Sequence, residues 1–479
     1  MTKVAIVGGG LLGLTLGLRL AEAGRRVQIF EAGPAVGGLA SWHDYGPFTW
    51  DRFYHCILPQ DGHLLELIRH LGLEADLVWR QTGTGYFGGG RAHSMSTTRD
   101  YLRFPLLSWI DKARVGATVA YAATLADPDE LYDISAEQWL TRWCGKSGYE
   151  VFWRPLLKAK FGPFYDRVAA VFIWATLTRL FGARSGALSK EKLGYVRGGY
   201  RAILQRFQSR LALLGAEVHV RSPVVAVRPS ASGSGCEVVC QVGHETGVSA
   251  FDEVYFTGPT QLARRVAEGV FSAEVDRVDR EYPSGGAYLG VACLALALRR
   301  ALTPFYVLNV GDESYELTGV IEMTNLVDRD AETAGFSLVY VPKYLGSDDP
   351  RLDASDSEIE ASLMDRGLCR LFPELRPSDV VYQEVHRTRF VQPLPLVGHG
   401  ARVAKAGDGR TSAEHSPRPF RILNTSMLTC ATLNNDEVVA FVDRFVAKLP
   451  VAPSGERSPS APAGARARSL PWSNGDRVA

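Results

Sequence analysis

Three glycines near the start of the chain have the spacing of a turn that holds a phosphate group. Gly8, Gly10 and Gly13 form a G-x-G-x-x-G motif directly after an apolar run. In such a motif the first glycine permits a tight turn, the second lets the backbone approach a diphosphate, and the third lets a helix pack closely on a strand. Leu11 and Leu12 open that helix, whose N-terminal amides and dipole attract anions. The motif therefore predicts a dinucleotide site.

An acidic residue stands where such a site needs a partner for the ribose. Glu31 lies 18 residues after Gly13, at the end of a second apolar run from Arg26 to Phe30. A carboxylate there accepts hydrogen bonds from ribose hydroxyl groups and disfavours a 2′-phosphate, so NADP is not expected. We place Ala32, which follows Glu31, in the same predicted site.

The residues around this loop have the patterns of the strand and helix that must position it. Residues 3–7 form a short apolar run suited to a buried parallel strand. The helix that follows is predicted to end at Ala23, because Gly24 is a typical helix stop. Strand, glycine turn, helix and second strand together are the beginning of a Rossmann-like fold.

The same pattern returns later in the chain, and other patterns separate its parts. It occurs in residues 199–258 and again near the end, with a strand at residues 420–423 and a helix at residues 436–448. Residues 100–185 have a mainly helical pattern, and residues 283–345 alternate as an antiparallel sheet does. We therefore predict an α/β protein with one Rossmann-like, dinucleotide-binding domain built from three chain segments and an inserted α+β substrate domain.

The expected domain boundaries follow these changes of pattern. The dinucleotide-binding domain is predicted at residues 1–90, 190–265 and 395–450. The substrate domain is predicted as a helical lid at residues 91–189 and a sheet-containing part at residues 266–394.

Composition and charge are those of an ordinary globular protein. Of the 479 residues, 46% are hydrophobic and 22% are charged, and the formal net charge is only +1. This balance gives no electrostatic reason to expect nucleic acid as a partner, so a small-molecule substrate is the expectation. Residues 451–479, rich in Pro, Ser, Ala and Arg, have the composition of a disordered tail. The oligomeric state is left open.

Seven cysteines are scattered along the chain, and no two have C-x-x-C spacing. This pattern argues against a disulfide framework or a zinc site and favours a reducing compartment, so no metal is expected. No uncharged apolar stretch reaches the length of a transmembrane helix. We expect a cytoplasmic protein, with peripheral contact to a membrane as an open alternative.

A second glycine pair selects the kind of dinucleotide. Gly37 and Gly38 follow the acid, and with Ser41 they resemble the GG motif of the flavin amine oxidase superfamily. That superfamily also holds phytoene desaturases, protoporphyrinogen oxidases and, more distantly, UDP-galactopyranose mutases. Leu39 replaces the arginine that usually follows the glycines, whereas Ser41 fits the usual small hydroxyl position. The resemblance implies FAD as the cofactor, bound without a metal, and an FAD-dependent oxidoreductase.

The resemblance extends to other segments and implies further cofactor contacts. Residues 48–55 resemble the stretch that runs past the flavin ring, and residues 197–200 resemble the second piece of the FAD-binding domain. By this resemblance Val225 and Val227 are expected to contact the adenine, and Asn424 is expected to contact the ribityl chain. Gly258 is expected at the strand that returns toward the cofactor, and Leu433 and Asn434 at the last helix.

Two residues are candidates for a role in catalysis. His55, with an ordinary pKa near about 6.5, can move a proton or hydrogen-bond the flavin, and the alternative is a loop histidine packed on Tyr54. Arg389 can bind an anionic substrate or lie beside flavin O2, and the alternative is a surface or salt-bridged arginine. For Lys158 and Lys160 in the predicted helical lid, a position on a solvated helix face is favoured over contact with substrate.

The predicted sheet strand at residues 285–296 contains no lysine, although plain amine oxidases of the superfamily carry one there. This favours a desaturase or oxidase type of reaction, in which a hydride passes from a small organic substrate to flavin N5. The alternative is a non-redox sugar mutase like the UDP-galactopyranose enzymes, with Arg387 and Arg389 clamping a nucleotide diphosphate. Cys430 can tether a flavin or be an inert thiol, and the electron acceptor is left open.

Overall fold

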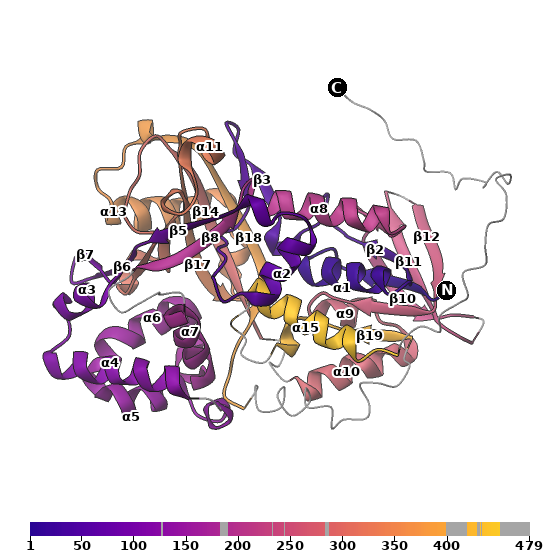
Figure 1. Cartoon of the computed structure of the whole chain (residues 1–479), viewed down its shortest axis with the longest axis horizontal. Helices are drawn as coiled ribbons and strands as arrows, with labels where there is room; N and C mark the ends of the chain where they lie inside the picture. The colour runs from indigo at the N-terminus through magenta and orange to yellow at the C-terminus, as the bar shows by residue number, and fades with distance from the viewer. Residues whose placement is uncertain are drawn as a thin grey trace. The chain divides into compact units, whose positions relative to one another are not determined.

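The parallel sheet is built around the first apolar run of the chain. In the computed structural model, β1 (Lys3–Val7) is the middle strand of five parallel strands in the order β19-β13-β1-β2-β9 (Figure 1). The other four strands are β2 (Arg26–Phe30), β9 (Glu217–His219), β13 (Glu253–Phe256) and β19 (Phe420–Ile422). Segments from the beginning, the middle and the end of the sequence therefore meet in one sheet.

The structure describes residues 1–125, 128–182, 190–231, 233–243, 245–282, 287–398, 419–428, 432 and 434–450. The described residues up to Leu449 belong to one unit. The predicted tail and the candidates Leu433 and Cys430 lie outside the described residues. The other six cysteines are all free thiols, as the spacing predicts.

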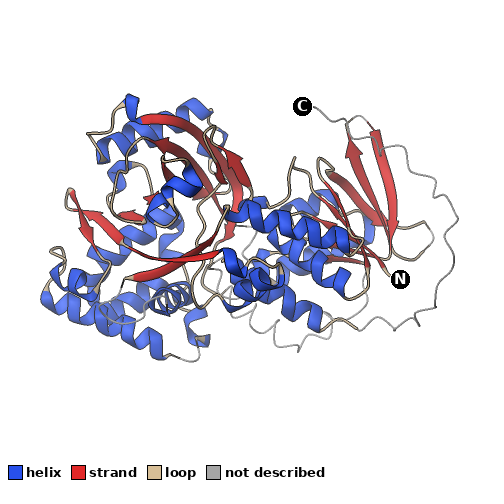
Figure 2. Cartoon of the chain, turned by 45° about the horizontal axis from the view of Figure 1, so that its top comes forward, coloured by secondary structure: helices blue, strands red, loops and turns tan. Residues whose placement is uncertain are grey.

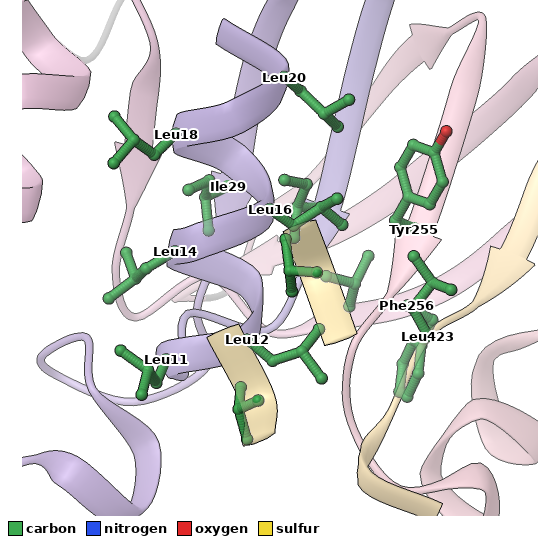
Figure 3. Packing of buried hydrophobic residues seen from close by; sticks show 14 of the residues in the cluster. Leu11, Leu12, Leu14, Leu16, Leu18, Leu20, Ile29, Tyr255, Phe256 and Leu423 are labelled. Atoms are coloured by element: carbon green, nitrogen blue, oxygen red, sulfur yellow. The ribbon is translucent and has the colours of Figure 1, made fainter. Parts of the chain in front are cut away.

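Helix α1 (Leu11–Glu22) carries apolar side chains on opposite faces because both the sheet and other helices pack against it. It packs on β1 and β2 and also against α8 (Gly199–Leu213) and α15 (Asn435–Ala447). Figure 3 shows its leucines leaving the helix on two sides, Leu11, Leu14 and Leu18 on one and Leu12, Leu16 and Leu20 on the other. A helix enclosed in this way keeps no polar face.

Two glycines allow this helix to lie close to the sheet. A Cβ atom at Gly13 would stand 2.0 Å from the carbonyl oxygen of Gly8, and one at Gly17 would stand 2.7 Å from Cδ1 of Ile29. The Gly13 contact is with backbone, which cannot rotate away as a side chain can. The close helix–strand packing predicted for Gly13 is thus present.

The largest sheet has seven strands in the order β18-β14-β17-β16-β15-β6-β7. Neighbouring strands are antiparallel except β15 and β6, and Figure 2 shows the strands of this sheet curving. Its strands are β6 (Thr84–Gly88), β7 (Arg91–Ser94), β14 (Tyr288–Leu298), β15 (Val307–Val310), β16 (Gly319–Glu322), β17 (Ser337–Gly346) and β18 (Val380–Pro393). Strand β6 comes from the segment predicted in the dinucleotide-binding part (residues 1–90) and strand β7 from the segment predicted as the helical lid (residues 91–189), and both lie in this sheet.

Three smaller sheets accompany these two. They are the pairs β3 (Trp42–Asp44) with β4 (Thr49–Asp51) and β5 (Leu77–Thr82) with β8 (Glu191–Val196), and the antiparallel trio β10 (Val224–Pro229), β11 (Cys236–Val242) and β12 (Glu245–Phe251). The pair of β5 and β8 links residues near 80 to residues near 195, on either side of the helical insertion.

Helices of the insertion gather into a group with its own core of aromatic and aliphatic side chains (Figure 1). They are α3 (Thr98–Arg103), α4 (Trp109–Thr124), α5 (Ala136–Gly148), α6 (Arg154–Phe161) and α7 (Ala170–Gly182). The remaining helices are α2 (Gly62–His70), α9 (Thr260–Val266), α10 (Ser272–Glu281), α11 (Arg329–Thr333), α12 (Asp356–Ala361) and α13 (Cys369–Leu371). Within the described ranges, none of the helices has the length and apolar character needed to span a bilayer.

The two glycines of the loop should respond differently to a methyl group. Gly13→Ala places Cβ 2.0 Å from a backbone oxygen, so we expect it to lower the free energy of unfolding by at least about 2 kcal/mol. Gly10→Ala meets no atom within 4 Å and should change it by less than about 0.5 kcal/mol. Urea denaturation followed by circular dichroism measures both, and equal losses would contradict this packing.

Candidate functional site

The turn at Gly8 is fixed by its conformation and by its neighbours. Gly8 has a φ of +116°, which side chains disfavour. Its N–H donates to the carbonyl of Phe30 at 2.8 Å, and the Thr257 hydroxyl lies 3.0 Å from the carbonyl oxygen of Val7 and 3.1 Å from that of Gly8. A Cβ atom at position 8 would stand 2.5 Å from Thr257 Oγ1, so this position requires glycine.

At Gly10 the loop faces open space. A Cβ atom there would meet no atom within 4 Å, although the φ of −70° suits any residue. Gly10 is the N-cap of α1, and in the described part of the chain no side chain caps this helix and no acid occupies its first turn. Leu11 and Leu12 are buried, so they offer backbone amides to a ligand and not side chains. Open space in front of an uncapped helix N-terminus fits a diphosphate.

Glu31 accepts hydrogen bonds from two backbone N–H groups and can still accept one from a ribose hydroxyl. Its Oε2 accepts the N–H of Gly9 at 2.7 Å, and its Oε1 accepts the N–H of Gly33, also at 2.7 Å. Each carboxylate oxygen has a further lone pair, which can accept a hydrogen bond from a ribose hydroxyl. Ala32 beside it is exposed. The carboxylate thus fits its predicted role and has a second, loop-closing role that the motif does not predict.

The second glycine pair lies directly against the first loop. Gly37 has a φ of +122°, and its N–H donates to the carbonyl of Gly9 at 2.8 Å. A Cβ atom at Gly38 would stand 3.3 Å from Cα of Gly10. Leu39 and Ser41, in the turn that follows, are half-buried. Residues separated by a strand, a turn and a helix thus surround the same open space at Gly10.

The two valines assigned to the adenine differ in accessibility. Val225 lies at an irregularity of β10, where the pairing with β11 shifts register between Val224 and Ala226, and it is 43% exposed. Val227 is 0% exposed, and its carbonyl accepts the N–H of Glu268 at 3.0 Å. Val225 is therefore the more accessible of the two for a nucleobase.

Asn424 is saturated by contacts within the protein. Its Nδ2 donates to the carbonyl of Gly258 at 3.1 Å and to Thr260 Oγ1 at 3.0 Å. Its Oδ1 accepts the N–H of Ser426 at 3.0 Å and the Ser426 hydroxyl at 2.6 Å. An asparagine side chain has two N–H donors and two acceptor sites, so none is left over for a ribityl chain in this arrangement. Asn424 ties the end of β19 to Gly258 at the end of β13.

The last helix begins where the sequence predicts. Asn434 is its N-cap, and its side chain accepts the N–H of Glu437 at 2.8 Å. Asn435, the first helical residue, donates from Nδ2 to the Tyr200 hydroxyl at 2.5 Å. The start of α15 is thereby tied to the start of α8.

Tyr200 joins three distant segments at one place. Its N–H donates to Asp51 Oδ1 at 2.7 Å, and its ring packs on His55 with 4.8 Å between ring centroids. The adjacent Gly199 leaves no room for a side chain, because a Cβ atom there would stand 2.7 Å from Asp51 Oδ1. His55 therefore packs on Tyr200 and not only on its neighbour Tyr54.

Burial keeps both Asp51 and His55 uncharged at neutral pH. It raises the pKa of the Asp51 carboxyl to about 8, against the opposing hydrogen bond from Tyr200. It lowers the pKa of His55 to about 4, against the opposing hydrogen bond to Phe53. Because His55 Nδ1 lies 2.9 Å from the carbonyl of Phe53, which can only accept, Nδ1 carries the proton and Nε2 keeps its lone pair.

Beyond His55, tyrosines from the sheet continue the buried surface. Tyr54 and Tyr344 of β17 share a hydrogen bond of 2.6 Å between their hydroxyl groups. The Tyr340 hydroxyl donates to the backbone carbonyl of Asp51. Strand β14 contributes Val291, Cys293, Ala295 and Ala297 to this cluster, and it contains no lysine.

The second catalytic candidate is held elsewhere by acids. Arg389 forms an ion pair with Asp353 and donates to the carbonyl of Ser347 at 2.7 Å. Arg387 pairs with Asp356 at 2.6 Å. Among the described residues we find no contact between Arg389 and His55. Arg389 is therefore a salt-bridged arginine, which is the alternative given for it above. Because Arg387 and Arg389 are both paired with aspartates, they are not free to clamp a nucleotide diphosphate.

Three residues of this site are absent from the sequence-based candidates: Asp51, Thr257 and Tyr200. Each of them lies beside a motif in the sequence, but only the fold shows that it belongs to the site. Asp51 opens the stretch expected beside the flavin, Thr257 precedes Gly258, and Tyr200 follows a glycine pair. Their importance comes from partners that are far away in the sequence.

The buried Asp51 carboxyl should make stability depend on pH. Its pKa rises from 3.8 unfolded to about 8 folded, so the stabilisation is complete below about pH 4 and is lost as pH rises through about 8. Asp51→Asn keeps an oxygen for the Tyr200 N–H but cannot titrate. We expect the free energy of unfolding of the natural protein to fall relative to this variant by a few kcal/mol between about pH 5 and about pH 8.

Urea denaturation at the two pH values measures this difference, with Asp44→Asn, an exposed acid on β3, as the matched control. A difference between the natural protein and Asp51→Asn that does not change with pH would show that Asp51 is ionised in the folded state.

Comparison with known proteins gives the family. The sequence profile of the family described as "Flavin containing amine oxidoreductase" matches residues 13–419. Among curated proteins, "Probable zeta-carotene desaturase" from Synechococcus elongatus is 26% identical over 255 residues, which cover 46% of this chain and 50% of that protein. The zeta-carotene desaturase of Zea mays is 27% identical over 159 residues, which cover 29% of this chain and 28% of that protein. The chain thus matches half or less of the length of these relatives.

Solved structures share the fold over almost the whole chain. Reduced UDP-galactopyranose mutase has a TM-score of 0.68 at 16% identity, covering 93% of this chain and 95% of that chain. Cyclohexylamine oxidase from Brevibacterium oxydans has a TM-score of 0.63 at 14% identity, covering 93% of this chain and 98% of that chain. At such low identities the likeness shows the α/β fold alone.

The profile match spans most of the chain, from the helix of the glycine loop to the last strand of the parallel sheet. It confirms the resemblance read from the two glycine motifs, and the open space at Gly10 suits the cofactor of this family. The chain therefore belongs to the flavin containing amine oxidoreductase family, with FAD as its cofactor.

Proposed function

We propose that this FAD-dependent oxidoreductase is of the desaturase or oxidase type and removes a hydride from an apolar small molecule. The observation that carries the proposal is the open space at Gly10, in front of an uncapped helix and beside the carboxylate of Glu31. The desaturase names of the curated relatives support the reaction type. In this proposal the FAD-binding part is residues 1–90, 190–265 and 395–450, and the substrate part is residues 91–189 and 266–394.

FAD, when bound, supplies a hydride acceptor at N5. The loop of Gly8 to Gly13 would hold the diphosphate through backbone amides, and Glu31 would accept a ribose hydroxyl. The segment from Asp51 to His55 would lie beside the flavin ring, by its resemblance to the family. Since burial keeps Asp51 and His55 uncharged, this side of the site carries no fixed charge that would disfavour an apolar substrate.

His55 is the proposed proton carrier. Its Nδ1 proton is held by the carbonyl of Phe53, so Nε2 is the atom that can accept a proton. The Tyr200 ring fixes the imidazole plane from one side. A pKa of about 4 makes this histidine a weak base, which suits holding a proton briefly and passing it on to water.

The strand next to this site argues against plain amine oxidation. Strand β14 contains no lysine, and its side chains in the tyrosine cluster are those of valine, cysteine and alanine. Small apolar side chains suit a flat, apolar substrate such as an isoprenoid polyene better than a cationic amine. No specific observation favours the mutase, because Arg387 and Arg389 are both paired with aspartates.

A bulky residue at position 10 should remove the cofactor and leave the fold intact. Gly10→Val fills the space expected for the diphosphate, and its Cβ meets no protein atom within 4 Å, so we expect FAD content to fall at least about tenfold, with the free energy of unfolding of the apoprotein unchanged. The visible flavin spectrum of the purified protein measures this content. Gly116→Val on α4, also open to solvent, is the matched control. Full FAD content in Gly10→Val would overturn the proposed site.

The reaction type is tested by flavin reduction under nitrogen. We expect an isoprenoid polyene to bleach the flavin bands, and putrescine or cyclohexylamine not to. His55→Gln should slow reduction by about a hundredfold, since it removes a positioned proton acceptor. Arg389→Gln should leave the rate within about twofold, because its partner is an exposed aspartate. Turnover of UDP-galactopyranose by the pre-reduced enzyme would instead identify a mutase.

A further inference from the structure

Lys160 is a lysine surrounded by aromatic rings near the end of α6. Its Nζ lies 5.0 Å from the ring centroid of Phe172, 5.6 Å from that of Tyr344 and 5.8 Å from that of Phe161. Its side chain is partly buried. The sequence pattern favours a solvated helix face for this residue, and the structure shows that this expectation is wrong.

Among the residues that the structure describes, the ammonium group of Lys160 has no anionic partner. Within the described ranges, no carboxylate lies within ion-pair distance of its Nζ. Lys158, two residues earlier on the same helix, differs, because its Nζ pairs with Glu313 at 3.0 Å. Burial lowers the pKa of Lys160 to about 8, so the group is still mainly protonated at neutral pH. A cation removed from water without a counter-ion is costly, and aromatic faces offset only part of that cost.

Hydrogen bonds fix this end of α6 to the sheet. The Thr318 hydroxyl donates to the carbonyl of Ala159 at 2.8 Å and accepts the N–H of Tyr344 at 3.2 Å. Gly162 ends the helix directly after Phe161. The backbone around Lys160 is therefore held in place, and the cation–aromatic contacts are a built feature of the fold.

The same tyrosine connects Lys160 to the predicted flavin-facing segment. The Tyr344 ring faces the ammonium group, and its hydroxyl bonds the hydroxyl of Tyr54 at 2.6 Å. Tyr54 is the neighbour of His55 in the segment expected beside the flavin. One side chain, that of Tyr344, thus connects the cation to Tyr54 of that segment.

We propose that Lys160 binds an acidic group, a carboxylate or a phosphate, at the end of an otherwise apolar substrate. This inference rests on the proposed function and narrows its substrate class. The acidic group supplies the counter-ion that Lys160 does not find among the described residues, while the apolar part extends past Tyr344 and Tyr54 toward the flavin. A hydrocarbon without a polar end would leave the cation unpaired.

The test compares two polyenes that differ only at one end, all-trans-retinoate and all-trans-retinol, binding to the FAD-loaded protein. Shifts of the flavin visible spectrum measure both affinities. We expect the natural protein to bind retinoate at least about tenfold more tightly than retinol. In Lys160→Met the affinity for retinoate should fall to that for retinol, with retinol binding unchanged. Lys160→Arg should keep most of the preference, and retinyl phosphate separates phosphate from carboxylate recognition.

Lys158→Met is the matched control, since it removes a charge from the same helix but from a paired lysine, and it should keep the preference. Equal affinities for the two probes in the natural protein, failure to bind either probe, or an unchanged preference in Lys160→Met would each overturn this assignment. FAD content and anaerobic reduction by a polyene are measured on the same samples. If they are normal while the preference is absent, the role of Lys160 fails and the proposed function stands.

Discussion

The contact between Gly13 and the carbonyl oxygen of Gly8 limits how the cofactor half of this protein can be built. A side chain at position 13 would occupy the space of a backbone oxygen, so α1 reaches its place on the sheet only with glycine there. That place puts the first turn of α1 in front of Glu31, Gly37 and Gly38. The ligand site is therefore a consequence of how closely a helix approaches a strand, and its polar groups are almost all backbone amides.

A second constraint holds the site together over long sequence distances. Tyr200 touches Asp51, His55 and Asn435 at once, so the segment from Asp51 to His55, the start of α8 and the start of α15 share one residue. Because this junction buries the Asp51 carboxyl, that group stays protonated at neutral pH. Asp51 and His55 are thus buried near each other, and both are uncharged at neutral pH.

The sequence predicts the parts of the site that are local. The strand, turn and helix around Gly8, Gly10 and Gly13, the acid at position 31 and the N-cap at Asn434 all follow from short-range rules about turns, helix ends and phosphate binding. The family follows from the same few residues together with Gly37 and Gly38. These signals are readable because each depends on neighbours within a short stretch of chain.

What the sequence could not predict depends on tertiary partners. Arg389 is positively charged in any reading, but only the fold shows that Asp353 pairs with it. Asn424 stands where a cofactor contact is expected, yet its donors and acceptors are taken by Gly258, Thr260 and Ser426. Lys160 has the spacing of a solvated helix face, and rings from α7 and β17 cover it. Polarity alone does not reveal which side chains are satisfied.

The position of α15 in the chain has a consequence for how the protein matures. The leucines of α1 are synthesised about 400 residues before β19, which forms the edge of the parallel sheet, and before α15, which packs on α1. Until then the nascent chain carries an apolar helix without its cover, a state that chaperones bind and that aggregates readily. The parallel sheet can therefore reach its full width only after residues 420–422 have been synthesised.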